Sequence, residues 1–133
     1  MMSDRPSQFI SGDWGTSRLR LRLIEADSLD TLAEVESDDG IGPTFRSWQE
    51  AGSPADREGF YLRVLAPSLD RLREASGMDL SSLTLVLSGM ASASIGMREL
   101  PYVSAPLPLS GEGLPTARIA PGVLPCETLL VTG

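Results

Sequence analysis

The chain has 133 residues, of which 41% are hydrophobic and 22% charged, and this is the size and composition of one globular domain. Its formal net charge of −7 opposes binding to a phosphate backbone, which excludes the class of nucleic-acid-binding proteins. It contains no histidine, so catalysis by a Ser-His-Asp or Cys-His set is excluded. No stretch resembles a membrane span or a secretory signal, and we expect a cytoplasmic protein without a membrane partner.

An antiparallel meander of three strands is predicted at the start of the chain. Residues 9–13 form a short strand, and residues 17–24 form a second one in which leucine and arginine alternate. The leucines Leu19, Leu21 and Leu23 share one face, and the arginines Arg18, Arg20 and Arg22 share the other. Residues 31–37 form the third strand. The simplest interpretation of Arg18 and Arg22 is the polar face of an edge strand, while Arg20 could have a structural or phosphate-orienting role.

One long helix should follow the meander. Residues 42–52 are predicted to be irregular. Ser53 as N-cap, Pro54 at the first helical position and Asp56 in the first turn predict a helix from there to about Ser76. Pro67 should kink this helix, and Gly77 should end it.

A second group of strands is expected in the rest of the chain. Residues 83–87 form a continuous apolar run, which is typical of a strand covered on both faces. Two short strands are possible at residues 117–120 and 127–131, and the single cysteine, Cys126, should be a small buried residue. Together these elements predict an α/β fold, with a mixed sheet that starts as the meander and is flanked by helix.

The turn GDWGTS, residues 12–17, separates the first two predicted strands. A glycine flanked by hydroxyl residues at a tight turn frees backbone N–H groups, which can bind phosphate oxygens. The Asp13 carboxylate could hold Mg²⁺ directly or through water. An ordinary hairpin turn would have the same residue types, so this alternative stays open.

Four segments resemble the 2-dehydro-3-deoxygalactonokinases, which belong to the actin-like sugar kinase superfamily. The stretch DWGTSRLR is similar to the superfamily's first phosphate motif, and SDDGI at residues 37–41 is similar to a segment that ends the third strand. The loop SGMASASIGMRELPYVSAPLPL at residues 88–109 resembles the galactonokinase loop, and IAPG at residues 119–122 resembles its Ile-Pro-Gly. The matches occur in the family's order and extend over most of the chain.

The resemblance implies the N-terminal lobe of an actin-like ATPase, a ribonuclease H-like fold. It further implies an enzyme that uses ATP and Mg²⁺ to phosphorylate 2-dehydro-3-deoxy-D-galactonate, or a related 2-keto-3-deoxy sugar acid, at its terminal hydroxyl. Asp13 would be the catalytic and metal-binding carboxylate. The residues implied to bind phosphate are Gly15, Thr16, Ser17 and Arg20. Those implied to bind the sugar acid are Gly40, Ile41, Gly89, Met90, Ser92, Ser94 and Tyr102.

These kinases have two lobes and about twice this length. Residues 1–133 would therefore form a single N-terminal lobe, without the lobe that binds the nucleotide, and we expect the isolated chain to be inactive. A homodimer would be compatible with this interpretation. Two further possibilities remain: a binding or regulatory module that retains the lobe's fold, and a different ATPase of the superfamily that acts on another small molecule.

Overall fold

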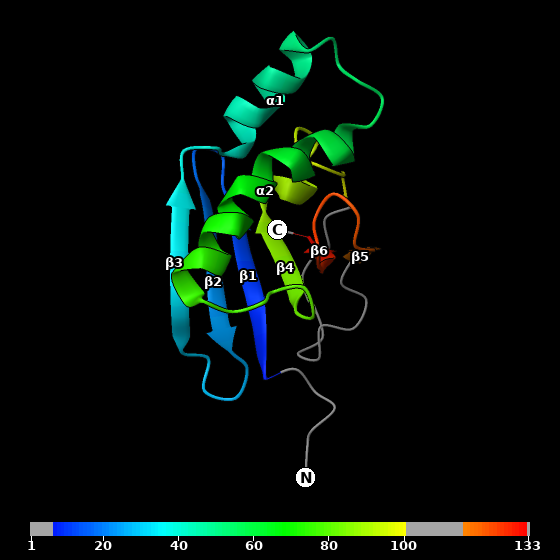
Figure 1. The fold of residues 1–133 in the computed structure, drawn as a ribbon. Coiled ribbons are helices and arrows are strands. Elements are labelled where there is room, and N and C mark those ends of the chain that lie inside the picture. The colour runs from blue at the N-terminus through cyan, green and yellow to red at the C-terminus, as the bar shows by residue number, and fades with distance from the viewer. Residues whose placement is uncertain (1–6, 101–115, 133) are drawn as a thin grey trace.

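The computed structural model describes residues 7–100 and 116–132, which form a six-stranded sheet and two α-helices (Figure 1). The strand order is β3-β2-β1-β4-β6-β5. The strands are β1 Gln8–Trp14, β2 Leu19–Glu25, β3 Thr31–Ser37, β4 Thr84–Gly89, β5 Thr116–Ile119 and β6 Glu127–Val131. The helices are α1 Ile41–Glu50, α2 Arg57–Ser76 and the short 3₁₀-helix η1 Met90–Ser92.

The sheet is mixed, and its first three strands form the predicted antiparallel meander. β1 pairs with β2 and β2 pairs with β3 in antiparallel register. β1 pairs with β4 and β4 pairs with β6 in parallel register, whereas β5 returns antiparallel beside β6. The predicted α/β class is confirmed. This topology brings the carboxyl ends of β1, β3, β4 and β6 to one edge of the sheet, which we call the upper edge.

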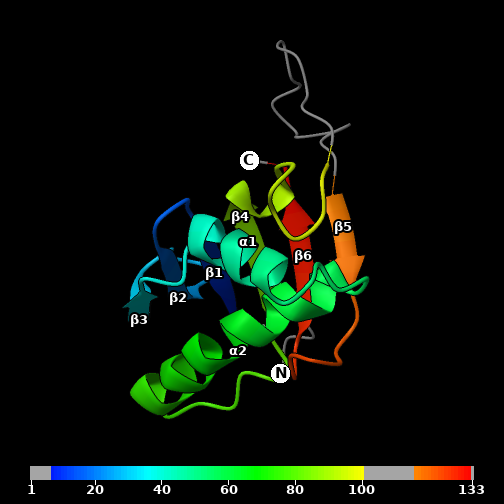
Figure 2. The ribbon, with the colours of Figure 1, turned by 90° about the horizontal axis from the view of Figure 1, so that it is seen from above.

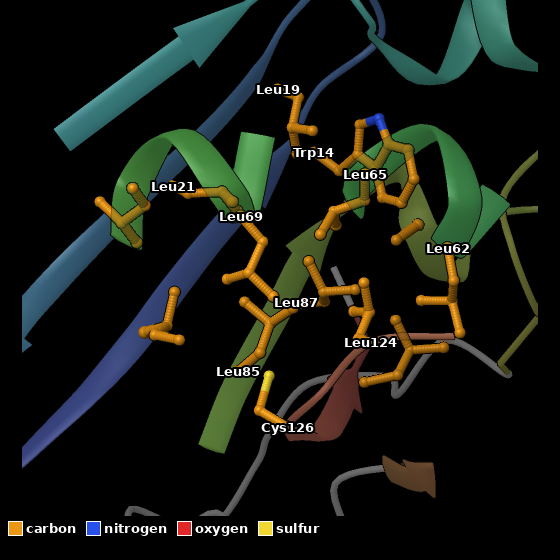
Figure 3. Close-up of a cluster of buried hydrophobic side chains, with 14 of the residues drawn as sticks. Trp14, Leu19, Leu21, Leu62, Leu65, Leu69, Leu85, Leu87, Leu124 and Cys126 are labelled. Carbon is orange, nitrogen blue, oxygen red and sulfur yellow. The ribbon is translucent and has the colours of Figure 1, made fainter. Parts of the chain in front are cut away.

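The hydrophobic core lies between the sheet and α2 (Figure 3). The leucines of β2 that alternate with arginines are all fully buried, as are Leu85 and Leu87 of β4. Helix α2 contributes five large buried side chains to this core: Tyr61, Leu62, Leu65, Leu69 and Leu72. Residues of one strand that face the same side recur with period two, so the alternation in the sequence predicted the buried face correctly.

The run at residues 83–87 is less enclosed than its sequence suggests. Val86 of β4 points away from α2 and is only half-buried. The expectation that this strand is covered on both faces is therefore wrong for the part of the chain that the structure describes. Helix α2 crosses one face of the sheet, whereas α1 lies beyond the upper edge and, seen from above, overlaps the strand ends (Figure 2).

Residues 42–52 are not irregular, because most of them belong to α1. Gly42 and Pro43 favour a loop by composition, but both occupy the first turn of the helix. In that turn the backbone amides have no partner within the helix, so a proline removes no hydrogen bond there. The buried side chains of Ile41 and Thr44 then hold the turn against the rest of the molecule.

Helix α2 starts three residues later than predicted. Its N-cap is Asp56, whose carboxylate accepts a hydrogen bond from the Gly59 amide at 2.9 Å. Ser53 instead has a φ of 52° and donates its amide to the Trp48 carbonyl at 3.0 Å, which ends α1. The end of α2 is as predicted, since Gly77 adopts φ 68° there.

Three smaller expectations have different outcomes. Cys126 is buried, as predicted. Pro67 lies within α2 without ending it, and the kink remains a prediction. β2 is not an edge strand, because it lies between β1 and β3, and the carboxylates of β3 pair with its arginines. In the described ranges, no helix is sufficiently long and apolar to span a membrane.

Candidate functional site

The candidate site lies at the upper edge, in the turn of residues 15–18 that joins β1 to β2, which we call the first turn. The amide of Gly15 donates to the Arg18 carbonyl at 2.8 Å and closes the turn. The side chains of Asp13, Thr16 and Ser17 are exposed. Within the described residues, the amides of Thr16 and Ser17 donate to no backbone carbonyl. The first turn and the adjoining end of β1 thus combine one exposed carboxylate, two exposed hydroxyl residues and two amides without a backbone partner among the described residues.

The N-terminus of α1 packs directly against the first turn. The Ile41 amide donates to the Gly15 carbonyl, and the Gly42 amide donates to the Thr16 carbonyl, each at 2.9 Å. A Cβ at Gly40 would lie 2.3 Å from the Ser17 carbonyl carbon and 2.4 Å from the Thr16 oxygen. Both Gly40 and Ile41, the first two residues predicted to bind substrate, are buried in this contact.

Trp14, the last residue of β1, anchors the strand end that leads into the first turn. Its side chain is fully buried, and its indole Nε1 donates to the Asp39 carbonyl at 2.8 Å. Because side chains alternate along a strand, the burial of Trp14 turns the preceding Asp13 to the opposite face. The exposure of Asp13 is consequently set by the core, with no need for a partner charge.

The end of β4 passes beside Asp13. Ser88 is the register partner of Asp13, and Gly89 follows with φ 88° and ψ −138°, a conformation that residues other than glycine essentially never adopt. A Cβ at Gly89 would lie 2.9 Å from Asp13 Oδ1 and 2.8 Å from the Trp14 carbonyl oxygen. The predicted phosphate turn and the start of the predicted substrate loop are therefore neighbours in space.

The loop after β4 folds back on itself. The Met97 amide donates to the Ala91 carbonyl at 2.8 Å, and the Leu100 amide donates to the Ser92 carbonyl at 2.9 Å. Of the predicted substrate residues, Met90 is half-buried, Ser94 is exposed and Ser92 is only 5% exposed. Tyr102 lies outside the described residues.

Comparison with known proteins identifies the family. The model of a family described as 2-keto-3-deoxy-galactonokinase matches residues 13–128. The chain belongs to this family. The match begins at Asp13 and covers every part of the candidate site that is described above.

A solved structure has the same fold as this galactonokinase family member. It is a candidate 2-dehydro-3-deoxygalactonokinase from Sinorhizobium meliloti, with a TM-score of 0.62 and 24% sequence identity. The similarity covers 94% of this chain but 34% of that one, so the chain spans about a third of the length of its structural neighbour. No curated protein matches the chain.

Arg20 of this family member lies opposite Asp13 in the β1–β2 register, but its guanidinium turns toward β3. Its Nε lies 3.6 Å from Glu34 Oε1, and its Nη2 lies 3.4 Å from Glu36 Oε2. In the part of the chain that the structure describes, Arg20 makes no ion pair with Asp13. A phosphate-binding role for Arg20 stays a prediction, and it would require Arg20 to turn from these glutamates toward the first turn.

Arg18 connects the first turn to β3 by charge. Its guanidinium forms an ion pair with Glu36, and a second one with Asp38 at 3.8 Å. The hydrogen bond and the positive charge of Arg18 lower the pKa of Glu36 from its ordinary value of 4.5. This pair is ionised at neutral pH and connects the end of the turn to the neighbouring strand.

The donor set of the turn fits a magnesium ion bound together with phosphate. In the described ranges, no three histidine, cysteine or carboxylate side chains gather into a metal cage. Mg²⁺ characteristically keeps several waters and takes only one or two carboxylates plus substrate phosphates. A single exposed carboxylate, Asp13, beside outward amides is compatible with that kind of binding.

Sequence reasoning missed two contributors to the site. The sequence predicts irregular structure where α1 begins, and so gives no indication of the bonds from this helix to Gly15 and Thr16. The sequence analysis does not single out Arg57, whose guanidinium donates to the Ser94 carbonyl in the loop after β4. The available signal was helical spacing: Phe45 and Trp48 are related as i and i+3, and Arg57 and Tyr61 as i and i+4. Such spacing places two side chains on one helix face, where aromatic rings can meet a cation.

Proposed function

We propose that this chain is the phosphate-binding and sugar-acid-binding lobe of an ATP-dependent kinase. Its substrate would be 2-dehydro-3-deoxy-D-galactonate or a related 2-keto-3-deoxy sugar acid, phosphorylated at the terminal hydroxyl. The observation that carries this proposal is the position of Asp13. Its exposed carboxylate lies at the carboxyl end of β1, between the open amides of the first turn and the backbone of Gly89.

Each part of the first turn has a role in the proposal. The amides of Thr16 and Ser17, with their hydroxyls, would bind the oxygens of the terminal phosphates. Asp13 would hold Mg²⁺ directly or through water. When bound, this cation neutralises charge that develops on the phosphoryl group during transfer. Since phosphoryl transfer depends mainly on positioning and charge neutralisation, a rigid turn of this kind suits it.

The loop after β4 would supply the sugar-acid side of the site. Met90 and Ser94 have accessible surface there, and backbone groups and small hydroxyls suit a ligand rich in hydroxyls and a carboxylate. Gly40 and Ile41 would act by holding the first turn, since both are buried. The 34% coverage of the structural neighbour supports the view that residues 1–133 form one lobe, with the nucleotide-binding lobe elsewhere. A cytoplasmic location and a homodimer remain predictions from the sequence.

Thermal unfolding and ADP release together test the proposal. The chain is heated with Mg²⁺-ATP, with 2-dehydro-3-deoxy-D-galactonate and with both, and ADP release is followed at the same time. A ligand present at 100 times its Kd should raise the free energy of unfolding by about 2.7 kcal/mol. Because the isolated lobe is expected to be inactive, stabilisation by both ligands without ADP release would support the proposal, whereas stabilisation by the sugar acid alone, with no response to Mg²⁺-ATP, would indicate a binding or regulatory module. The absence of stabilisation by either ligand would refute the kinase proposal for this chain.

The variant Asp13→Asn tests whether the exposed Asp13 carboxylate takes part in binding Mg²⁺-ATP. The Asp13 side chain is exposed, so we expect the stability of the free protein to change by no more than about 0.5 kcal/mol. Stabilisation by Mg²⁺-ATP, and any ADP release, should be lost. The matched control is Asp27→Asn, which removes an exposed carboxylate in the turn between β2 and β3. Equal responses of the two variants to Mg²⁺-ATP would remove Asp13 from the site.

A further inference from the structure

Arg57, the first residue of α2, is surrounded by aromatic rings. Its guanidinium carbon lies 4.8 Å from the ring centre of Trp48, 5.4 Å from that of Phe45 and 5.6 Å from that of Tyr61. Phe45 and Trp48 stack on one another at 5.9 Å, with 28° between the ring planes. We call these four residues the Arg57 cluster. It joins α1 to the first turn of α2, because Phe45 and Trp48 belong to α1.

The Arg57 cluster binds the loop after β4 through backbone carbonyls. Arg57 Nη2 donates to the Ser94 carbonyl at 2.7 Å, and the Tyr61 hydroxyl donates to the Ile95 carbonyl at 2.7 Å. An ion pair between Glu58 and Arg98 at 2.6 Å adds a third contact from the same helical turn. The beginning of α2 therefore contacts three separate positions of one five-residue segment, residues 94–98.

The tyrosine of the cluster remains a hydrogen-bond donor at all physiological pH values. Burial raises the pKa of Tyr61 above its ordinary value of 10.0, although the neighbouring Arg57 opposes the shift. The ring of Tyr61 also contacts Trp14, with centres 6.0 Å apart and 57° between the planes. Continuous contacts thus lead from Trp14, next to Asp13, through Tyr61 to the loop.

The setting of Arg57 differs from that of an arginine in a surface ion pair. Its guanidinium contacts three aromatic faces and a carbonyl oxygen, and its Nε is buried without a hydrogen-bond partner in the described part of the chain. A planar guanidinium can stack on rings and direct a donor at a carbonyl at once, which an ammonium group cannot do. The contacts set a direction for the donor, and this suits a positioning role.

We propose that Arg57 is a positioning residue for the sugar-acid side of the site. By stacking in the Arg57 cluster and binding the Ser94 carbonyl, it sets the course of residues 94–98 and so the placing of Ser94 relative to Asp13. This inference rests on the proposed function for its link to the sugar acid, whereas the coupling between Arg57 and the loop can be tested without any ligand.

Hydrogen exchange of the free chain tests the coupling first. Arg57→Met retains a long side chain that can pack on the rings but removes the charge and the donor. We expect the amides of Gly96, Met97 and Leu100 to exchange at least about tenfold faster in this variant, because their bonds to residues 91–93 depend on the loop's course. Amides in β1 and β4 should exchange at unchanged rates. Arg57→Lys should give an intermediate increase, and Arg63→Met, at an exposed arginine of the same helix, should give none.

Two results would overturn the coupling. One is unchanged exchange in residues 96–100 of Arg57→Met. The other is an equal acceleration in β1 and β4, which would show a loss of global stability only. Tyr61→Phe provides a milder second variant, since it removes only the bond to the Ile95 carbonyl and should accelerate exchange in the same segment.

Calorimetric titration then tests the link to the ligand. The Kd of 2-dehydro-3-deoxy-D-galactonate should rise about tenfold or more in Arg57→Met and partly recover in Arg57→Lys, while the response to Mg²⁺-ATP stays as in the unaltered chain. A faster-exchanging loop with an unchanged Kd would refute the positioning role. If the unaltered chain does not bind the sugar acid at all, the proposed function fails, and the exchange experiment still decides whether Arg57 sets the loop.

Discussion

The meander contains two turns that connect neighbouring antiparallel strands, and they are held in different ways. The first turn, residues 15–18, receives hydrogen bonds from the N-terminus of α1 and an ion pair from β3 in addition to its own closing bond. The second turn, residues 26–30, joins β2 to β3. It is closed by local bonds, from the Glu25 amide to the Asp30 carbonyl at 2.9 Å and from the Leu29 amide to the Glu25 carbonyl at 2.7 Å.

The second turn also accepts a strained residue. Leu29 has φ 62° and is 67% exposed, and a leucine in this left-handed region costs about 1–2 kcal/mol. Beyond the local bonds, the Ala26 amide donates to the Ser7 carbonyl at 2.8 Å. The second turn is therefore held by local bonds and by one bond to the residue before β1, whereas the first turn is also bound by the N-terminus of α1. The extra contacts of the first turn keep its backbone in one conformation, as a preorganised phosphate site would require.

The largest expected effect comes from breaking the contact between α1 and the first turn. In Gly40→Ala, the new Cβ would meet backbone atoms of residues 16–18 at 2.3–2.6 Å, and backbone cannot move aside as a flexible side chain can. We expect a loss of about 3 kcal/mol in the free energy of unfolding. Chemical denaturation measures this loss. The control is Gly122→Ala, where the added Cβ would have no atom within 4 Å.

A smaller change should result from removing the strain of the second turn. Asparagine tolerates the left-handed region better than leucine, so Leu29→Asn should raise the free energy of unfolding by about 0.5 kcal/mol. Leu32→Asn is the matched control, since Leu32 is an exposed leucine on the adjacent strand β3 without a positive φ. If Leu29→Asn is no more stable than Leu32→Asn, strain in the second turn contributes nothing measurable.

The smallest effect concerns the ion pair at the end of the first turn. Because Arg18 lowers the pKa of Glu36, the pair stabilises the protein above the ordinary pKa of 4.5, and this contribution is lost as the pH falls below that value. Glu36→Gln should thus lower the Tm slightly at pH 7, and the difference should shrink toward pH 3. Glu50→Gln, at an exposed residue of α1, serves as control. A constant Tm difference across this pH range would exclude the pair as its cause.

Local sequence pattern was sufficient to predict much of the fold. The Leu/Arg alternation of β2 assigned each side chain to a face, because successive side chains in a strand point in opposite directions. Gly77 correctly marked the end of α2, since glycine adopts the left-handed conformation without strain. Four segments in the expected order likewise indicated the family, because each is a short local motif, and the family model matches residues 13–128.

Contacts between segments that are distant in the sequence could not be predicted from local sequence pattern. Gly42 and Pro43 predict a loop, yet they begin α1, because packing of Ile41 and bonds to the first turn outweigh their weak helix propensity. The Arg57 cluster unites side chains from two helices with a loop 37 residues away from Arg57. Periodicity reports which residues share a face of one element, whereas burial and hydrogen bonding between elements depend on how those faces meet. The packing of these elements against one another determined the exposure of Asp13 and the environment of Arg57.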